Sequence, residues 1–415
     1  MTSPSRPIAA LAAALIALAA VAGAAPAQKR DATTTLFSRA LDGGVPNGPS
    51  TNPVISADLR YAQVIAFESE ASDLVAGDEN QMKDVFAVRR AGSFGDTGSE
   101  WVPGPAQLVS RGLNGAPANG PSFDPAVDGN TQNRARCVGF LSDASNLVSG
   151  DTNGVTDAFV AKAPKFVPKR VSLPDNRQSK SASTDVAVAG DCSRVAFVAG
   201  GKLFERVGSS TKRVDVKGSE ADPLYDSGDT LALVFGGGGG VYLRAEGASR
   251  ATRVVKNATN PAYINRRRLG KVRRLVAYET ERGGFRQVGV RELGGGERIA
   301  SAYDGEVGNG DSTDPTIFNS GFNVAFNSEA SNLPTRTNGQ KSDRNGLVDA
   351  YFWSGSPNVP QPVTILESVD SDNDPLLMGG NNVSTSQYRN YVLFESSAND
   401  PLAPPQIYMR YLGGI

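Results

Sequence analysis

Short apolar runs that end in an aromatic residue recur along the whole chain. The ring follows a small or branched residue at Ala66-Phe67, Gly139-Phe140, Ala196-Phe197, Val234-Phe235, Ala277-Tyr278, Ala325-Phe326 and Leu393-Phe394. Gly, Pro, Asn and Asp bound these runs. Apolar runs of about four to eight residues between such turn formers are typical of β-strands. The pattern therefore predicts equivalent strands along the chain.

Further strands flank each run in the same order. A short strand precedes it, often opened by proline, at Pro53, Pro125, Pro223, Pro261, Pro315 and Pro375. A second apolar segment follows, at residues 84–88, 157–160, 202–205, 241–244, 287–290, 349–352 and 406–409. A third follows six of the runs, at residues 107–110, 169–172, 212–216, 252–255, 297–301 and 362–366. Four-stranded antiparallel units repeated in a ring are propeller blades, so we predict an all-β, seven-bladed β-propeller.

The seventh unit lacks a fourth strand of its own. The chain instead has a spare strand near its start, at residues 33–38, which ends in Ser like the outer strands at Ser110 and Ser172. We expect this strand to pair with the last blade and close the ring, because closure covers an otherwise open sheet edge. Six or eight blades are the alternatives if the weak units around Phe235 and Tyr278 are miscounted.

Polar motifs repeat with the strands. Asn-Gly-x-Ser-x-Asn/Asp-Pro occurs at residues 47–53, 119–125 and 309–315, and Ser-acid-Ala-Ser-x-Leu at residues 69–74, 142–147 and 328–333. A fixed repeat indicates one supersecondary unit used many times. We interpret the first motif as a turn that leads into a strand. We expect Leu74, Leu147 and Leu333 to pack between blades.

The third repeated motif is Asp-x-Asn-x-x-x-Asp. Its copies are Asp78/Asn80/Asp84, Asp151/Asn153/Asp157 and Asp343/Asn345/Asp349. Closely spaced oxygen side chains suit calcium, which binds six to eight oxygens, and Gly154 and Gly346 favour a tight loop. The alternative is a plain turn, because Asp and Asn fold over their own backbone without any ion. Calcium is thus a candidate cofactor, and none is required.

These motifs resemble the WD40-like, or PD40, β-propeller repeat family, which includes the propeller of TolB. That family's blade pattern is matched by Pro53-Val54-Ile55-Ser56-Ala57-Asp58 with Ala66-Phe67, and by Asp84-Val85-Phe86-Ala87-Val88. Leu59 departs from the glycine usual after the aspartate. The N-terminal domain that TolB carries before its propeller is not matched. The resemblance implies a secreted propeller that binds a partner, and it implies no activity.

The first residues resemble a secretion signal. Arg6 precedes an apolar run from Ile8 to Ala25, and Ala25-Pro26-Ala27 fits a small-x-small cleavage site. We expect residues 1–27 to be removed, leaving one propeller domain at residues 28–415 outside the cytoplasm. A retained membrane anchor is the alternative, although the run is built of Ala and is short for a span.

Charge and residue usage exclude several functions. The formal net charge of −1 becomes −2 once Arg6 is removed, which disfavours nonspecific nucleic-acid binding. The chain has no histidine, so Ser-His-Asp catalysis and His-ligated metal sites are impossible. No residue is assigned a catalytic role. The cysteines, Cys137 and Cys192, form either a disulfide or two separate buried thiols.

One basic cluster stands out, at Arg266, Arg267, Arg268, Lys271, Arg273 and Arg274. It suits an anionic polymer such as an acidic glycan. The alternative is a solvated loop. The five glycines at residues 236–240 predict a hairpin connection and do not match a phosphate-binding loop.

We therefore expect a non-catalytic binding or protein-interaction scaffold. Its partner would be an envelope or extracellular protein, or a glycan, and we expect a monomer without a membrane span after cleavage. Two other functions remain open. One is a calcium-dependent carbohydrate or cell-wall binder, and the other is a glycan hydrolase or lyase that relies on two carboxylates.

Overall fold

The computed structural model describes residues 32–412, except for residues 59–61, 92–100, 131, 215–219, 269–270, 319–322, 335–344, 356–362 and 387–389. They belong to one compact unit, Asp31–Ile415. Among the described residues the regular structure is β-strand, apart from two short 3-10 turns, η1 (Leu113–Gly115) and η2 (Pro174–Asn176).

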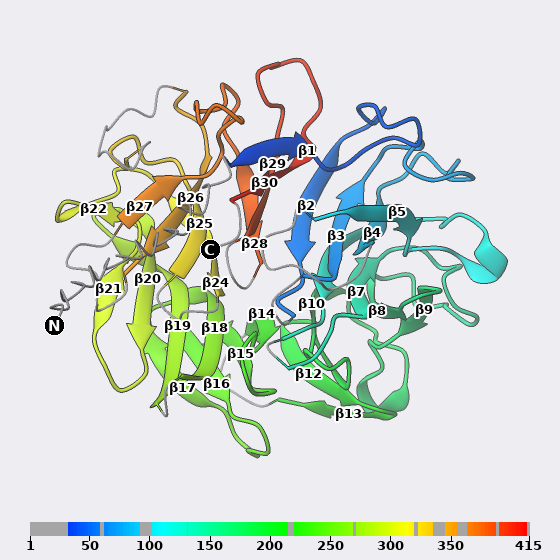
Figure 1. Ribbon diagram of the computed structural model, residues 1–415. Helices are drawn as coiled ribbons and strands as arrows, with labels where there is room; N and C mark the ends of the chain where they lie inside the picture. The colour runs from blue at the N-terminus through cyan, green and yellow to red at the C-terminus, as the bar shows by residue number, and fades with distance from the viewer. Residues whose placement is uncertain are drawn as a thin grey trace, which may run out of the picture. The chain divides into compact units, whose positions relative to one another are not determined.

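Seven four-stranded antiparallel sheets follow one another around a ring, as Figure 1 shows. The predicted seven-bladed propeller is confirmed. Blades 1 to 3 are β2 (Ser50–Ile55), β3 (Val64–Ser69), β4 (Asp84–Arg90) and β5 (Pro103–Leu108); β6 (Ser122–Val127), β7 (Cys137–Ser142), β8 (Asp157–Lys162) and β9 (Val167–Arg170); and β10 (Ser183–Val188), β11 (Arg194–Ala199), β12 (Lys202–Val207) and β13 (Ser210–Arg213).

Blades 4 to 6 continue in the same order. They are β14 (Glu220–Tyr225), β15 (Leu233–Gly237), β16 (Gly240–Arg244) and β17 (Thr252–Lys256); β18 (Thr259–Arg268), β19 (Lys271–Arg282), β20 (Phe285–Glu292) and β21 (Glu297–Ile299); and β24 (Ser312–Phe318), β25 (Asn323–Ser328), β26 (Asp349–Ser354) and β27 (Val363–Leu366). A separate hairpin, β22 (Ala302–Tyr303) with β23 (Glu306–Val307), precedes blade 6. As expected, Gly237 and Gly240 flank the hairpin turn between β15 and β16.

Blade 7 is built from both ends of the chain. β28 (Asn381–Thr385), β29 (Tyr391–Ser396) and β30 (Gln406–Tyr411) are completed by β1 (Thr33–Leu36), which pairs with β30 from Thr33↔Tyr411 to Leu36↔Tyr408. Figure 1 shows β1 lying against β30. The predicted closure is confirmed, and it gives the last blade its fourth strand.

Stacked aromatic rings form the centre of most blades. The aromatic ring in the second strand lies opposite a ring in the third strand, with centroids 5.3 to 6.1 Å apart, in Phe67–Phe86, Phe140–Phe159, Phe197–Phe204, Phe235–Tyr242, Phe326–Tyr351 and Phe394–Tyr408. Such pairs add about 0.5–1.5 kcal/mol each beyond their area burial. Blade 5 differs, because Tyr278 lies opposite Gly289.

The prolines of the inner strands lie inside the strands rather than at their starts, which corrects the sequence prediction. In blade 1 the pairing register shifts between Thr51 and Val54, and Asn52 has φ 50°. A bulge leaves the inserted residues outside the ladder, so the missing N–H of Pro53 costs no hydrogen bond. Pro375 opens no strand at all, because it pairs with Val369 in an isolated bridge and β28 begins at Asn381.

Apolar clusters span neighbouring blades. Leu74 packs in a core that joins blades 7 and 1, Leu147 in one that joins blades 1 and 2, and Leu333 in one that joins blades 5 and 6. All three leucines are buried, as the repeated motif predicted. The blades are therefore held face to face by the hydrophobic effect.

We predict that Ser38→Ala destabilises the closed ring. The buried Ser38 Oγ donates to Gln406 Oε1 at 2.8 Å and accepts from Ile407 N at 3.0 Å. Loss of the hydroxyl leaves both partners unpaired, which costs about 1–3 kcal/mol for each buried group. Urea unfolding measures the change. The exposed Ser371, which also contacts β1 through Thr34, is the control; equal midpoints for Ser38→Ala and Ser371→Ala would contradict the prediction.

Candidate functional site

The Asp-x-Asn loop of blade 1 is a hydrogen-bonded clasp between blades. Asn80 Nδ2 donates to Asp84 Oδ2 at 2.7 Å and to the carbonyl oxygen of Ala118 at 3.2 Å, just before blade 2. Asn80 Oδ1 accepts from the N–H of Met82 at 3.0 Å, which forms an Asx-turn. Ser110 Oγ donates to Asp84 Oδ1 at 2.5 Å. Each of these groups therefore has a structural role.

The loop of blade 2 has the same clasp and an added cation. Asn153 donates to Asp157 at 3.0 Å and to the carbonyl oxygen of Ser179 at 3.0 Å. The guanidinium of Arg170 lies 3.0 Å from Asp151 and 3.2 Å from Asp157. An arginine thus supplies the positive charge that these two carboxylates need.

Blade 6 has the clasp in part. Asn345 Nδ2 donates to the carbonyl oxygen of Leu376 at 3.2 Å, and Ser368 Oγ donates to Asp349 at 2.7 Å. Asp343 lies outside the described residues.

The blade 1 loop has no arginine at the position of Arg170. Leu108 takes that place, because Leu108 pairs with Phe86 as Arg170 pairs with Phe159. Asp78 is buried, and its Oδ1 has no hydrogen-bond partner among the described residues. Burial, and to a smaller extent the charge of Asp78, raises the pKa of Asp84 to about 6, although the hydrogen bonds from Ser110 and Asn80 lower it. Asp78 and Asp84 therefore lack the arginine that pairs with the two aspartates of the blade 2 loop.

Buried aspartates also lie at the ends of three inner strands. Asp58, Asp128 and Asp226 are each at most 1% exposed. Burial raises the pKa of Asp58 to about 6 and the pKa values of Asp128 and Asp226 to about 7. Each carboxylate accepts hydrogen bonds from its own hairpin, as Asp226 does from the N–H groups of Gly228 and Thr230. They stabilise turns.

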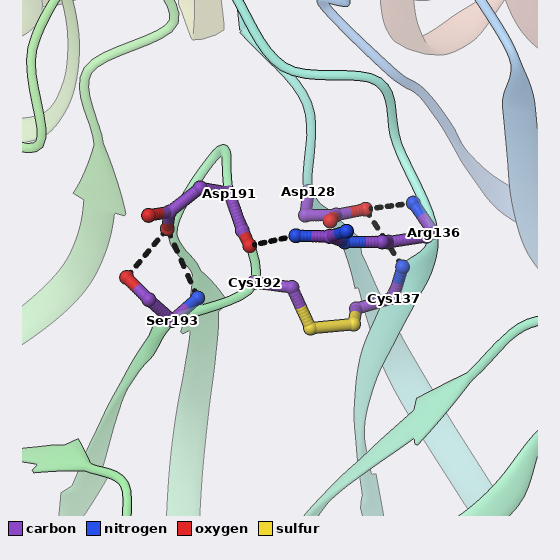
Figure 2. The surroundings of a disulfide bond; sticks show 6 residues. All are labelled: Asp128, Arg136, Cys137, Asp191, Cys192 and Ser193. Carbon is purple, nitrogen blue, oxygen red and sulfur yellow. Dashed lines mark hydrogen bonds between the residues drawn. A yellow bond between two sulfur atoms is a disulfide. The ribbon is translucent and has the colours of Figure 1, made fainter.

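A disulfide joins blades 2 and 3, as Figure 2 shows. Cys137 begins β7, Cys192 lies in the turn between β10 and β11, and their Cα atoms are 6.0 Å apart. Asp128 lies beside them and accepts from the N–H groups of Arg136 and Cys137 at 2.5 and 2.7 Å. In the described part of the chain this is the one cluster of three residues from the set His, Cys, Asp and Glu whose ligand atoms lie within 4.8 Å of one another. Both sulfurs are in the S–S bond, so they are not thiolate ligands.

Carboxylates on the second strands of blades 1, 5 and 7 each link their blade to the next one. They accept main-chain N–H groups from the neighbouring blade: Asp124 N to Glu68 at 2.7 Å, Asp314 N to Glu279 at 2.9 Å, and Asn52 N to Glu395 at 2.9 Å. The acceptors directly follow the stacked rings or Tyr278 along the chain. These acids were not predicted from the sequence, although each directly follows the aromatic residue of its strand and this fixed spacing was a usable signal.

The same end of the ring has a polar cleft of about 400 Å³. Five acids and one arginine line it: Asp222, Glu279, Asp311, Asp314, Glu329 and Arg286. Burial, and then the charge of Asp185, raises the pKa of Asp222 to about 6. The neighbouring Asp124 has a pKa of about 7 for the same reasons. Carboxylates with raised pKa values in a cleft are candidates for acid–base chemistry as well as for binding.

The basic cluster predicted from sequence is on paired strands rather than in a loop. β18 and β19 extend as a long hairpin, with Arg266 opposite Arg273 and Asn265 opposite Arg274. Pairing positions these residues on a defined sheet, which a solvated loop would not do. The described side chain of Arg274 is exposed and lines a separate cleft of about 470 Å³.

No protein-family model and no curated protein matches this chain. Among solved structures, a putative TolB from Agrobacterium tumefaciens is 15% identical, with coverage of 57% of this chain and 80% of that one and a TM-score of 0.38. An acylaminoacyl peptidase from Pyrococcus horikoshii is 10% identical over 88% of this chain and 52% of that one, with a TM-score of 0.47. An ancestral GH74 enzyme is 10% identical over 91% and 51%, with a TM-score of 0.46.

This chain thus spans about half of the length of the last two proteins. At these identities the likeness concerns the fold alone, and one fold serves many functions.

We predict that calcium raises the melting temperature of the protein through the blade 1 loop. Leu108→Arg places a guanidinium where blade 2 has Arg170, so it should remove the calcium response, and Asp78→Asn should remove it too. Differential scanning calorimetry with calcium and with a chelator measures the shift. If neither calcium nor the chelator changes the melting temperature of the wild type, the three loops are turns only.

We also predict that stability falls as the pH rises. The folded pKa of Asp128 is about 7, compared with an ordinary value of 3.8. The folded state therefore binds more protons than the unfolded state between about pH 4 and 7, and the free energy of unfolding decreases across that window. Melting temperatures at pH 5 and 8 test this.

Asp128→Asn is the informative variant for this pH dependence. Its Oδ1 can keep both main-chain hydrogen bonds, while the amide takes the place of Oδ2, which has no hydrogen-bond partner. The variant should flatten the pH slope, and the exposed Asp175→Asn should not. A melting temperature that rises from pH 5 to 8 would contradict the prediction.

Proposed function

We propose that this protein is a non-catalytic binding scaffold that acts outside the cytoplasm after removal of residues 1–27. The observation that carries the proposal is the structural role of three acids. Glu68, Glu279 and Glu395 accept hydrogen bonds from main-chain N–H groups of the next blade. A carboxylate held this way supports the ring. The ring then serves as a rigid frame that presents clefts and loops.

The residue inventory agrees with a binding role. The chain has no histidine, so a serine or cysteine nucleophile lacks its usual base. Of the acids whose pKa values rise to about 7, Asp128 and Asp226 accept hydrogen bonds from main-chain N–H groups of their own turns, and Asp124 lies beside the 400 Å³ cleft. Loops on a rigid scaffold are where proteins place their binding residues.

Location outside the cytoplasm is supported by the apolar N-terminal segment and by the bond between Cys137 and Cys192. Disulfides persist in oxidising compartments and are rare in reducing ones. No helix among the described residues is long and apolar enough to cross a bilayer.

One experiment tests both parts of the proposal. The full-length chain is expressed with its first 27 residues, and the exported protein is collected and its N-terminus determined by mass spectrometry. We expect Gln28. The exported protein is then incubated with panels of glycans and peptides, and products are sought by mass spectrometry while binding is followed by biolayer interferometry.

We predict retention of a glycan or an extracellular protein without turnover. A product that appears with the wild type and disappears in Asp124→Asn and Asp222→Asn would overturn the proposal. The protein would then be a carboxylate-based hydrolase or lyase that uses Asp222 of the 400 Å³ cleft and the neighbouring Asp124. Retention in the cytoplasm with residues 1–27 intact would overturn the location.

A further inference from the structure

Blade 5 breaks the pattern of stacked rings, and a cleft lies at the break. Tyr278 has no ring opposite it, and its own ring covers Gly289 so closely that a Cβ there would lie 2.6 Å from the ring. Beside Tyr278 is a cleft of about 630 Å³ between β17 of blade 4 and strands β19 to β21 of blade 5. Blade 5 therefore has no ring at residue 289, the position at which each of the other blades has a stacked aromatic side chain.

This cleft, which we call the rim cleft, is strongly basic. Arg253, Lys256, Arg282 and Arg291 line it together with one acid, Glu297. A neighbouring cleft of about 470 Å³ shares Arg291 and Val254 and adds two more cations, Arg250 and Arg274. The formal charge of the whole chain is −1, so this concentration of positive charge is local. Such a surface attracts anions.

Most of these cations are not neutralised by the protein. Arg282 pairs with Glu297 at 3.2 Å, and both side chains are partly exposed. In the described part of the chain, no ion pair involves Arg253, Lys256 or Arg291. Arg253 and Lys256 are exposed, and Arg291 is half-buried. These three side chains are available to an anionic ligand.

A buried hydroxyl also points to a ligand. Tyr278 is 1% exposed, and its oxygen has no well-aligned hydrogen-bond partner among the described residues. Burial, followed by the charge of Glu297 and a hydrogen-bonding contact with its carboxylate, raises its pKa well above the usual range, so the hydroxyl keeps its proton. Incomplete hydrogen bonding of a buried hydroxyl carries a free-energy cost. A ligand oxygen in the rim cleft would remove that cost.

We propose that the rim cleft binds a segment of an acidic polysaccharide, with uronate carboxylates at Arg253, Lys256 and Arg291. A sugar oxygen would accept the hydrogen bond of Tyr278. The exposed neutral amide of Asn257 also lines the cleft, and it suits sugar hydroxyls, which polyphosphate lacks. The inference rests on the proposed function and names the ligand class of the scaffold.

The test uses the mature chain and an oligogalacturonate of eight residues in isothermal titration calorimetry. Its fully methyl-esterified form is the matched neutral ligand, and polyphosphate of similar charge is the second probe. We expect binding of the acid form, weakening with added salt because exposed charges are screened. We expect no binding of the ester and weaker binding of polyphosphate.

Two variants locate the site. Arg253→Gln with Arg291→Gln should weaken oligogalacturonate binding at least about tenfold, because charge-assisted hydrogen bonds are the strong ones. Tyr278→Phe, which keeps the ring, should weaken it by about fivefold, the typical value of one neutral hydrogen bond. Lys202→Gln with Lys212→Gln removes two exposed charges from blade 3 and should leave the affinity unchanged.

Several results would overturn the inference. They are equal affinity for acid and ester, tighter binding of polyphosphate, an equal loss with the blade 3 control, or no binding of oligogalacturonate. If Arg291→Gln disturbs folding, as its melting temperature would show, Arg253→Gln with Lys256→Gln replaces it, since both side chains are exposed. Absence of glycan binding with retention of an extracellular protein would defeat this inference alone, whereas turnover would defeat the proposed function.

Discussion

The pairing of the first strand with the last is the contact on which the rest of the fold depends. β1 gives blade 7 its outer strand, and Gln406 Nε2 of β30 donates to the carbonyl oxygen of Gly48 at 2.9 Å, at the entrance to blade 1. Without this pairing the last blade would leave a free sheet edge, and blades 7 and 1 would lose a tie between them. Each blade then packs between two neighbours, whereas each end blade of an open array would have only one.

Near the ends of the inner strands, neighbouring blades are held together largely by polar groups rather than by apolar side chains. A bulge there turns main-chain N–H groups away from their own sheet, and a buried N–H needs a partner. Glu68 supplies the partner for Asp124, and Glu279 supplies it for Asp314. The acids are thus a consequence of the bulges. This is the physical reason for a frame that is rich in buried carboxylates yet proposed to be without a catalytic role.

Departures from the repeat are more informative about binding than the repeat itself. The clasps of blades 1 and 2 share their Asp and Asn residues, but Arg170 neutralises one and Leu108 leaves the other without a cation. Blade 5 keeps the aromatic anchor, but Gly289 removes its partner and the rim cleft lies there. The other six blades place an aromatic residue opposite the anchor, where blade 5 has Gly289. A different residue at that position therefore changes the surface without changing the fold.

The sequence by itself determined the number of blades, the strand that closes the ring and the exclusion of histidine chemistry. These features depend on periodicity within about ten residues and on composition, which are local. Only the tertiary structure decided the bond between Cys137 and Cys192, because a disulfide requires a short Cα distance between residues far apart in the chain. It also decided that the Asn80 amide nitrogen faces Asp84, and that Arg253 and Arg291 line one cleft. Such contacts arise from how neighbouring blades stack, and no local pattern records which side chains then meet.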